Sequence, residues 1–306
     1  MVGWSHFSNQ KGLILGLLLA GFGLGAPLFN LVATDIINPD NETETIMARE
    51  GSKMNFYFGY GLAQNFPPML RWLSLIYLVI GVFGIVLMGK ANKHAVEPSS
   101  WKENILTHLQ SRRFLLLVAC SLLSGLAAQC GLEAYKVLGY KTFRDNEFMS
   151  SIRSTSAICS GSLMLFWAFV VGKFGFKHIY RFLLVIQIVV FCSFYFVDGE
   201  KDLFKIWAIF MVICAIAQLA VFPALHGTIY GRELGGLLYC VLFLTYAVSV
   251  LSGFFIQLYI VKAVGYLATY LLLGGMTISS LVVTFMFDAD APLKEETKEF
   301  LIKDVN

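Results

Sequence analysis

Eight apolar runs divide the sequence, and each has the length of about 20 residues that a helix needs to cross the hydrocarbon core of a bilayer. Lipid offers the backbone no hydrogen-bond partner, so these runs predict helices, whereas a barrel would show short strands of alternating polarity. The first run has no small-residue cleavage site and does not resemble a signal peptide. The runs lie at 12–34, 68–89, 114–137, 152–172, 179–197, 204–225, 234–260 and 264–287.

Composition supports a chain solvated by lipid. Hydrophobic residues make up 57% of the sequence and charged residues 14%, which is outside the range of ordinary soluble domains. The six cysteines fall inside apolar runs without a C-x-x-C pair, so we predict no metal and no cofactor. The net charge of +3 and the lack of a basic block argue against a nucleic-acid partner. We therefore expect an all-α, multi-pass membrane protein of about eight transmembrane helices, with membrane lipid as its partner.

The basic connectors predict the orientation. Cytoplasmic loops carry an excess of Lys and Arg, and with eight crossings both termini then lie in the cytoplasm. The acidic loop 35–67 contains Asn41 in an Asn-Glu-Thr glycosylation motif, which is used only outside the cytoplasm. Other cations, such as Lys136 and Lys141, lie on the opposite side, and the sequence does not say which membrane holds the chain. The connectors taken as cytoplasmic contain Lys90, Lys93, Lys102, Arg112, Arg113, Lys173, Lys177 and Arg181.

A polar connector at 90–113 separates two apolar runs from the six that follow it. Four regions follow from this division. Residues 1–89 hold two helices and an outer loop, and residues 90–113 form a cytoplasmic linker. Residues 114–287 form a six-helix bundle, and residues 288–306 form a cytoplasmic tail.

Three local motifs resemble the major facilitator superfamily, in particular its oxalate/formate antiporter and monocarboxylate transporter branch. The basic segment 7–12 and the glycine-rich run behind it resemble the start of the fifth helix in that family. Small residues at every fourth position also suit ordinary close packing of two helices. This first motif includes Gly12, Gly16, Gly21, Gly25 and Pro27.

The second motif is the short basic turn 172–178, which resembles the family's hairpin between helices eight and nine. It holds Gly172, Lys173, Gly175 and Lys177. Its glycines permit a tight reversal, and its cations favour the cytoplasmic surface. The family's aspartate before this lysine is replaced by Gly172. In the third motif, Pro223 and the segment up to residue 236 resemble the end of the tenth helix and the loop that follows it.

The resemblance implies a partial major facilitator fold that comprises helices five to twelve. Its implied activity is secondary-active transport of a small organic solute by alternating access around a midplane site. Dicarboxylate-handling relatives carry a cation inside helix eight and another inside helix eleven, and the corresponding segments 159–165 and 242–247 have none. A monocarboxylate or a neutral solute is therefore the expected substrate, and a homodimer is expected if the chain is complete.

Polar groups inside the membrane are the candidates for substrate binding or coupling, because burying them is costly unless they are paired or hydrated. Gln129, Glu133 and Lys136 recur at helical spacing on one face of the third run. Glu133 can pair with Lys136, can carry a coupled proton, or can simply reach the water at the membrane boundary. Further candidates, each with an alternative role in packing or at the interface, are Arg153, Gln218, Tyr239 and Tyr246.

Other classes of function have less support in the sequence. Neither H-E-x-x-H nor G-x-S-x-G occurs, so we predict that the protein is not an enzyme. The sequence shows no clear filter segment of an ion channel. The main alternative is a truncated or transport-inactive relative that acts as a membrane interaction or sensor protein.

Overall fold

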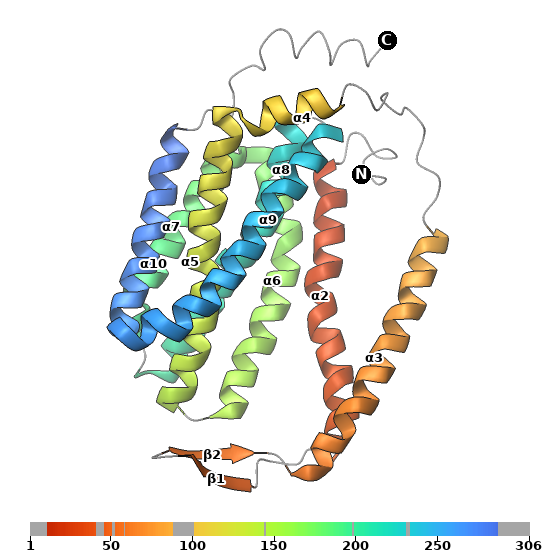
Figure 1. Ribbon diagram of the computed structural model, residues 1–306, viewed down its shortest axis with the longest axis vertical. Coiled ribbons are helices and arrows are strands. Elements are labelled where there is room, and N and C mark those ends of the chain that lie inside the picture. The colour runs from red at the N-terminus through yellow and green to blue at the C-terminus, as the bar shows by residue number, and fades with distance from the viewer. Residues whose placement is uncertain are drawn as a thin grey trace. The chain divides into compact units, whose positions relative to one another are not determined.

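The computed structural model describes residues 11–40, 46–50, 53–57, 59–87, 101–143, 145–197, 199–230 and 233–286. Within them, one long helix occupies each of the eight predicted runs, so the protein is an all-α membrane protein (Figure 1). The helices are α2 (Lys11–Ile37), α3 (Tyr60–Leu87), α5 (Arg112–Phe143), α6 (Asn146–Phe174), α7 (Phe176–Phe194), α8 (Lys201–Ile229), α9 (Glu233–Phe255) and α10 (Val261–Met286).

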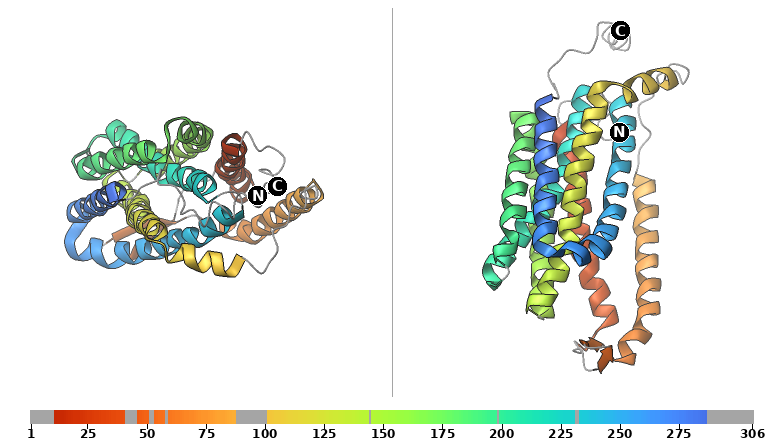
Figure 2. Two further views of the ribbon diagram at one scale, coloured as in Figure 1. Left: turned by 90° about the horizontal axis from the view of Figure 1, so that it is seen from above. Right: turned by 60° about the vertical axis from the view of Figure 1, so that its left-hand side comes forward.

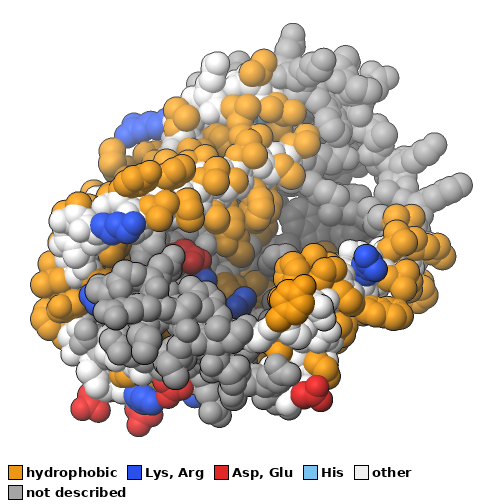
Figure 3. All heavy atoms as spheres, turned by 60° about the horizontal axis from the view of Figure 1, so that its bottom comes forward, with side chains coloured by type: hydrophobic (Ala, Val, Ile, Leu, Met, Phe, Trp, Pro, Cys, Tyr) orange, Lys and Arg blue, Asp and Glu red, His pale blue; other side chains and the backbone are white. Residues whose placement is uncertain are grey.

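Six apolar helical segments of the described chain are long enough to cross a membrane. The last of them, Leu234–Met286, has 53 residues and includes both α9 and α10, so it can cross twice at about 20 residues per crossing. The surface supports the same conclusion, because hydrophobic side chains predominate among the described residues seen in Figure 3. On α6, for example, Phe166 and Phe169 are exposed. A surface of this kind is suited to acyl chains, and the protein is a multi-pass membrane protein.

Polar segments contain three elements that the apolar pattern did not predict. The expected loop 35–67 holds an antiparallel hairpin of β1 (Ile46–Glu50) and β2 (Lys53–Tyr57). In addition, α3 starts at Tyr60, before the predicted start at residue 68. The expected linker 90–113 contains the short helix α4 (Trp101–Leu109). Asn41 and the tail 288–306 lie outside the described residues.

The contacts divide the chain into two compact units, residues 24–92 and the remainder. In the smaller unit, the Asn65 amide donates to the carbonyl of Ile37 at 3.1 Å and joins the start of α3 to the end of α2. The rings of Phe29 and Tyr77 meet edge to face, with centroids 4.7 Å apart. This unit also holds the hairpin. The predicted boundary of the first region, at residue 89, lies close to that of the smaller unit, but residues up to Gly23 belong to the larger one.

In the larger unit, the helices α5 to α10 run roughly along a common axis, and each helix is antiparallel to the one before it (Figures 1 and 2). Helix α5 packs mainly on α9 and α10, and α8 packs mainly on α6 and α7. Three further pairs, α7 with α10, α5 with α8 and α8 with α9, complete the main packing. Exchanging the triad α5–α7 with the triad α8–α10 converts all of these pairs into one another except α8 with α9, whose counterpart, α5 with α6, is a much weaker contact. Because each triad has three helices, the two triads run in opposite directions.

Two apolar clusters fill this bundle, one towards each end. The first surrounds Phe114, Tyr180 and Phe222, at the end where α4 lies. The second surrounds Phe191 and Phe204 near the opposite end. Between the clusters, at mid-height, lie buried hydroxyl and amide side chains from α5, α7, α8 and α10.

Glycine makes two of the chain reversals. Gly175 has φ 80° between α6 and α7, and Gly265 has φ 81° near the start of α10, a region that favours glycine. Gly172 lies inside α6, so Gly175 alone makes the reversal of the basic turn. Before Gly265, α9 continues through a π-helical turn, η3 (Ile256–Ile260).

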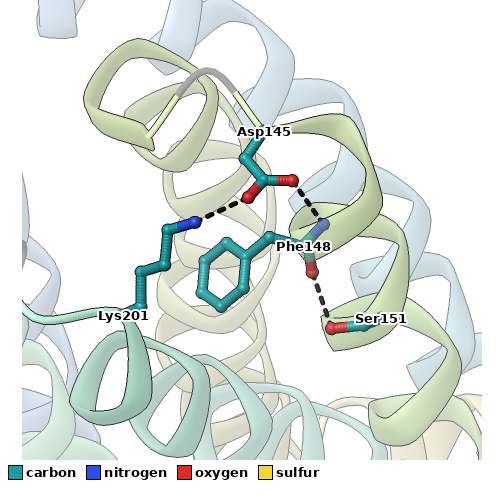
Figure 4. Close-up of polar contacts among 4 residues, drawn as sticks. All are labelled: Asp145, Phe148, Ser151 and Lys201. Carbon is teal, nitrogen blue, oxygen red and sulfur yellow. Dashed lines mark hydrogen bonds and ion pairs between the residues drawn. The ribbon is translucent and has the colours of Figure 1, made fainter.

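Asp145 joins two helices, α6 and α8, at the end of the bundle opposite α4 (Figure 4). Its Oδ1 accepts from the Phe148 amide at 2.8 Å and caps α6, as Asp commonly does at a helix start. Its Oδ2 lies 2.6 Å from Nζ of Lys201, at the start of α8. The Ser151 hydroxyl donates to the Phe148 carbonyl at 2.8 Å. Asp145 therefore anchors both α6 and α8, which are neighbours in the packing.

Replacing Asp145 should separate these two contributions. Asp145→Ala removes the cap and the ion pair and should lower the free energy of unfolding by roughly 1–2 kcal/mol, mostly from the cap. Asp145→Asn retains a capping oxygen and should lower it by less than about 1 kcal/mol, because exposed ion pairs contribute little. Unfolding by SDS in mixed micelles would measure both, and equal losses would contradict the assignment of the cap.

A second prediction concerns a glycine that allows close contact between two helices, α5 and α7. A Cβ on Gly131 of α5 would lie 2.5 Å from Cε1 of Phe191 on α7. Gly131→Ala should therefore destabilise the protein by roughly 1–3 kcal/mol in the same assay. The control is Gly275→Ala on α10, where nothing lies within 4 Å of the new Cβ and helix propensity favours alanine by up to about 1 kcal/mol. Equal effects of the two changes would contradict this packing.

Candidate functional site

The strongest polar contact between helices on the predicted face joins two of the sequence candidates. Nε2 of Gln129 on α5 donates to Oη of Tyr246 on α9 at 2.8 Å, and both side chains are partly buried. The Tyr246 ring stacks on Phe243, with centroids 5.4 Å apart and an angle of 14°. Tyr239 continues this aromatic row, 5.8 Å from Phe243. We call Gln129, Tyr239, Phe243 and Tyr246 the α5–α9 face.

Small residues bring α5 and α9 close enough for this bond. The hydroxyls of Ser121 and Thr245 lie 2.9 Å apart, and a Cβ on Gly125 would lie 3.3 Å from Oγ of Ser249. Further along, a Cβ on Gly253 would lie 3.4 Å from the amide nitrogen of Cys130. Small residues of this kind let helix backbones approach closely in membranes. The face is therefore held at a fixed register along two parallel helices.

The charged candidates of α5 pair with each other. Nζ of Lys136 lies 2.9 Å from Oε1 of Glu133, and their side chains are 42% and 52% exposed. Of the three interpretations from the sequence, the structure shows the pairing of Glu133 with Lys136, and both side chains lie at the surface of the bundle. Arg153 is exposed on α6. The structure does not bring Arg153 into the α5–α9 face.

Gln218 belongs to a different, fully buried group, here called the central network. Its Oε1 accepts from Oγ of Ser124 at 2.9 Å, and its Nε2 donates to Oε1 of Gln187 at 2.9 Å. Gln187 in turn donates from Nε2 to Oγ1 of Thr277 and to the carbonyl of Ser124, both at 3.2 Å. Helices α5, α7, α8 and α10 are thus joined by amide and hydroxyl groups without a charge.

Tyr180 extends the central network towards the α4 end. Its Oη lies 2.8 Å from Oγ of Ser124 and 3.1 Å from Oγ of Ser280. The Ser280 hydroxyl donates to the carbonyl of Cys120 at 3.1 Å. Each hydroxyl has a hydrogen to donate and an acceptor in reach, so these buried groups are satisfied. The network fixes the bundle rather than offering free groups to a ligand.

The glycine and proline motifs have mixed outcomes in the structure. In α2, Gly23 approaches α6, because a Cβ there would lie 2.9 Å from Cα of Gly161. Gly21 has nothing within 4 Å, and Gly25 has only Phe29 at 4.0 Å. Gly12, Gly16 and Pro27 lie in α2, but their surroundings are outside the described part. Pro223 lies inside α8, which continues to Ile229, and does not end it.

Basic residues of the α6–α7 turn gather at the α4 end. Lys173 and Lys177 flank Gly175. One helical turn later, Arg181 donates from Nε to Oγ1 of Thr284 at 3.0 Å and from its guanidinium to the Thr284 carbonyl at 2.9 Å. Arg181 thereby caps the last turn of α10, where carbonyls lack helical partners.

Sequence reasoning missed most of the central network. Gln187 carried the same signal as Gln129 and Gln218, an amide inside an apolar run, and could have been found from it. The hydroxyl members offer no such signal, because Ser, Thr and Tyr are common in transmembrane helices. His226 follows directly after the run predicted at 204–225, but α8 extends past it, and the side chain is 0% exposed.

Comparison with known proteins adds no relative. No protein-family model matches the chain, and no curated protein matches it at a significant level. No group of three or more metal-ligating side chains occurs among the described residues. Arguments about function therefore rest on the helices and the polar groups between them.

A leucine scan of the two polar groups should distinguish them. Gln218→Leu leaves Oε1 of Gln187 without its partner in an apolar core and should lower the free energy of unfolding by roughly 1–3 kcal/mol. Gln129→Leu, at the partly exposed α5–α9 face, should lower it by less than about 1 kcal/mol, the usual value for one bond between membrane helices. SDS unfolding of the purified protein measures both, and a larger loss for Gln129→Leu would contradict the assignment.

Proposed function

We propose that the protein is a secondary-active transporter of the major facilitator type that moves a small organic solute by alternating access. The observation that carries this proposal is the exchange relation between α5–α7 and α8–α10. Transporter folds are often built from repeats of opposite orientation, and movement of one repeat or bundle against another opens their site to each side in turn. Two three-helix units of opposite direction that share most of their packing relations support such a fold.

The polar α5–α9 face supports the same function. It lies along the helices, between the exposed Glu133 and Lys136 near one end and Tyr239 towards the other. Its amide and phenol groups are only partly buried, unlike those of the central network. A solute can exchange its hydrogen bonds with water for bonds to Gln129 and Tyr246, and it can lie against the ring of Phe243.

The chemistry of the face limits the substrate class. Gln129 and Tyr246 offer hydrogen bonds, and the nearest cation on α5, Lys136, is already paired with Glu133. A dianion would need unpaired cations to replace its hydration. We therefore propose a neutral solute or a monocarboxylate, whose single charge requires less compensation.

A transport-inactive membrane interaction or sensor protein is the second candidate. One observation favours it: the central network is closed, neutral and fully buried, so it resembles a structural core more than a binding site. The two candidates differ in whether purified protein moves any solute.

Exchange in proteoliposomes tests the proposal. Vesicles loaded with unlabelled lactate should take up radiolabelled lactate, and Tyr246→Phe should slow this exchange on the order of fivefold, the effect of one hydrogen bond of about 1 kcal/mol. Tyr259→Phe, at a tyrosine that is 67% exposed, serves as the matched control and should have no effect.

A panel of other monocarboxylates and sugars would follow if lactate is not exchanged. Folded protein that moves no member of the panel would reject transport and favour the sensor candidate. Equal loss in the two tyrosine variants would retain transport but remove the α5–α9 face from it.

A further inference from the structure

His226 is an ionisable side chain sealed inside the bundle near the α4 end. It belongs to the last turns of α8 and is 0% exposed. Ionisable groups inside membrane segments are rare, and they commonly mark proton or ion pathways. The position also lies beyond Pro223, which has no amide hydrogen and so removes one helical bond from α8. The end of α8 that carries His226 is therefore less firmly tied to the rest of the helix.

The hydrogen bonds of His226 fix its protonation pattern. Nδ1 lies 2.9 Å from the carbonyl oxygen of Phe222. A carbonyl only accepts, so Nδ1 carries the hydrogen, and in the neutral ring Nε2 is a bare acceptor. Nε2 has no hydrogen-bond partner within the described part of the chain. The one open position of this ring is therefore a site for a proton.

Aromatic rings from three segments surround His226. Phe114 of α5 lies 6.3 Å from it, Tyr239 of α9 lies 5.9 Å from it, and Tyr230 at the end of α8 lies 5.8 Å from it, between ring centroids. Tyr230 also contacts His108 of α4, at 5.6 Å. His226 thus lies under the end of the α5–α9 face, where a change in its charge reaches α4, α5 and α9 together.

The titratable neighbours offer no anion to an imidazolium. Tyr239 and Tyr230 face the ring, and Arg113 of α5 acts on both Tyr230 and His108. His108 of α4 is a titratable group beside Tyr230, and burial, with a smaller effect of Arg113, lowers its pKa. Trp167 of α6 and Tyr180 of α7 belong to the apolar cluster that contains Phe114 and Tyr230, and they carry no charge there. No carboxylate of the described side chains acts on His226.

We propose that His226 is a proton-linked latch that holds the ends of α8 and α9 closed when neutral and releases them when it binds a proton. A charged ring in this dry, anion-free position is strongly disfavoured. Proton uptake at Nε2 therefore accompanies opening of the α4 end, where water reaches the ring. By linkage, a fall in pH at that end shifts the bundle towards the open state.

The size of the pH effect on the population of the open state follows from the binding of one proton. An open state whose histidine has the ordinary pKa of about 6.5 gains about tenfold in population between pH 7.5 and pH 5.5 over a closed state that excludes the proton. The start of α9 should report the change, because Leu238 and Leu242 pack in the same cluster at 0% and 2% exposure.

Hydrogen exchange of the full chain in nanodiscs tests the latch. After correction for the intrinsic rate, amides of residues 234–242 should exchange about tenfold faster at pH 5.5 than at pH 7.5. His226→Asn keeps a donor towards the Phe222 carbonyl but cannot take up the proton, so this acceleration should disappear. His178→Asn, at an exposed histidine of α7, is the matched control and should exchange like the unaltered protein.

Three outcomes would overturn the latch: equal corrected exchange at the two pH values, acceleration that persists in His226→Asn, or acceleration that is lost in His178→Asn. If His226→Asn does not fold, nitrogen NMR of ring-labelled histidine in the unaltered protein decides instead. The doubly protonated form must then appear with the same pH dependence as the exchange of residues 234–242.

The role of the latch in transport rests on the proposed function, and lactate exchange distinguishes a failure of the latch from a failure of the proposed function. His226→Asn should keep lactate exchange without a pH gradient and lose the response to acidification on the α4 side. If the unaltered protein moves no solute, the proposed function fails, whereas the hydrogen-exchange result still decides the latch.

Discussion

The bundle depends on a layer of uncharged hydrogen bonds at mid-height. Two helices in lipid gain nothing from leaving water, so their register must come from packing and polar contacts. Ser124, Gln187, Gln218 and Thr277 supply these contacts, one from each of four helices. An amide offers a donor and an acceptor, so the two glutamines can link four helices without burying a charge. A shift of one helix by a turn would leave several of these groups without partners.

The helices outside the central network are the ones most suited to move. Of the main bundle, α6 and α9 contribute no member to it, and they correspond to each other when the triads are exchanged. Each packs on a network helix instead: α6 packs on α8, and α9 packs on α5, where small residues allow a close approach. We therefore expect the four helices of the central network to stay fixed while α6 and α9 move. Both candidate regions, the α5–α9 face and the latch, involve α9.

The sequence predicted the long helices because their physical signal is local. Each apolar run of about 20 residues became a helix, and the ends differed mainly where polar residues continue one, as at Tyr60 before the run at residue 68. The hairpin and α4 were missed because hydropathy carries no signal for elements outside the membrane. The partners of Gln129 and Gln218 could not be predicted, because they depend on which helices pack together. Gln129 and Tyr246 were both among the candidates from the sequence, although their contact was not predicted, whereas Tyr180 and Ser280 were not among them.

The two ends of the bundle differ in how well their buried polar groups are satisfied. The central network closes on itself, yet three buried atoms have no hydrogen-bond partner among the described residues: Trp167 Nε1, His226 Nε2 and Tyr270 Oη. Trp167 belongs to the apolar cluster at the α4 end, where His226 also contacts Phe114 and Tyr239, whereas Tyr270 belongs to the other cluster. An unpaired polar group in a dry core is unfavourable, and hydration relieves it. The α4 end therefore gains more from opening to water than the opposite end does, where Asp145 and Lys201 already hold α6 to α8. The transport by alternating access that we propose would need two ends that respond to different conditions, and this difference in satisfied polar groups is one such difference.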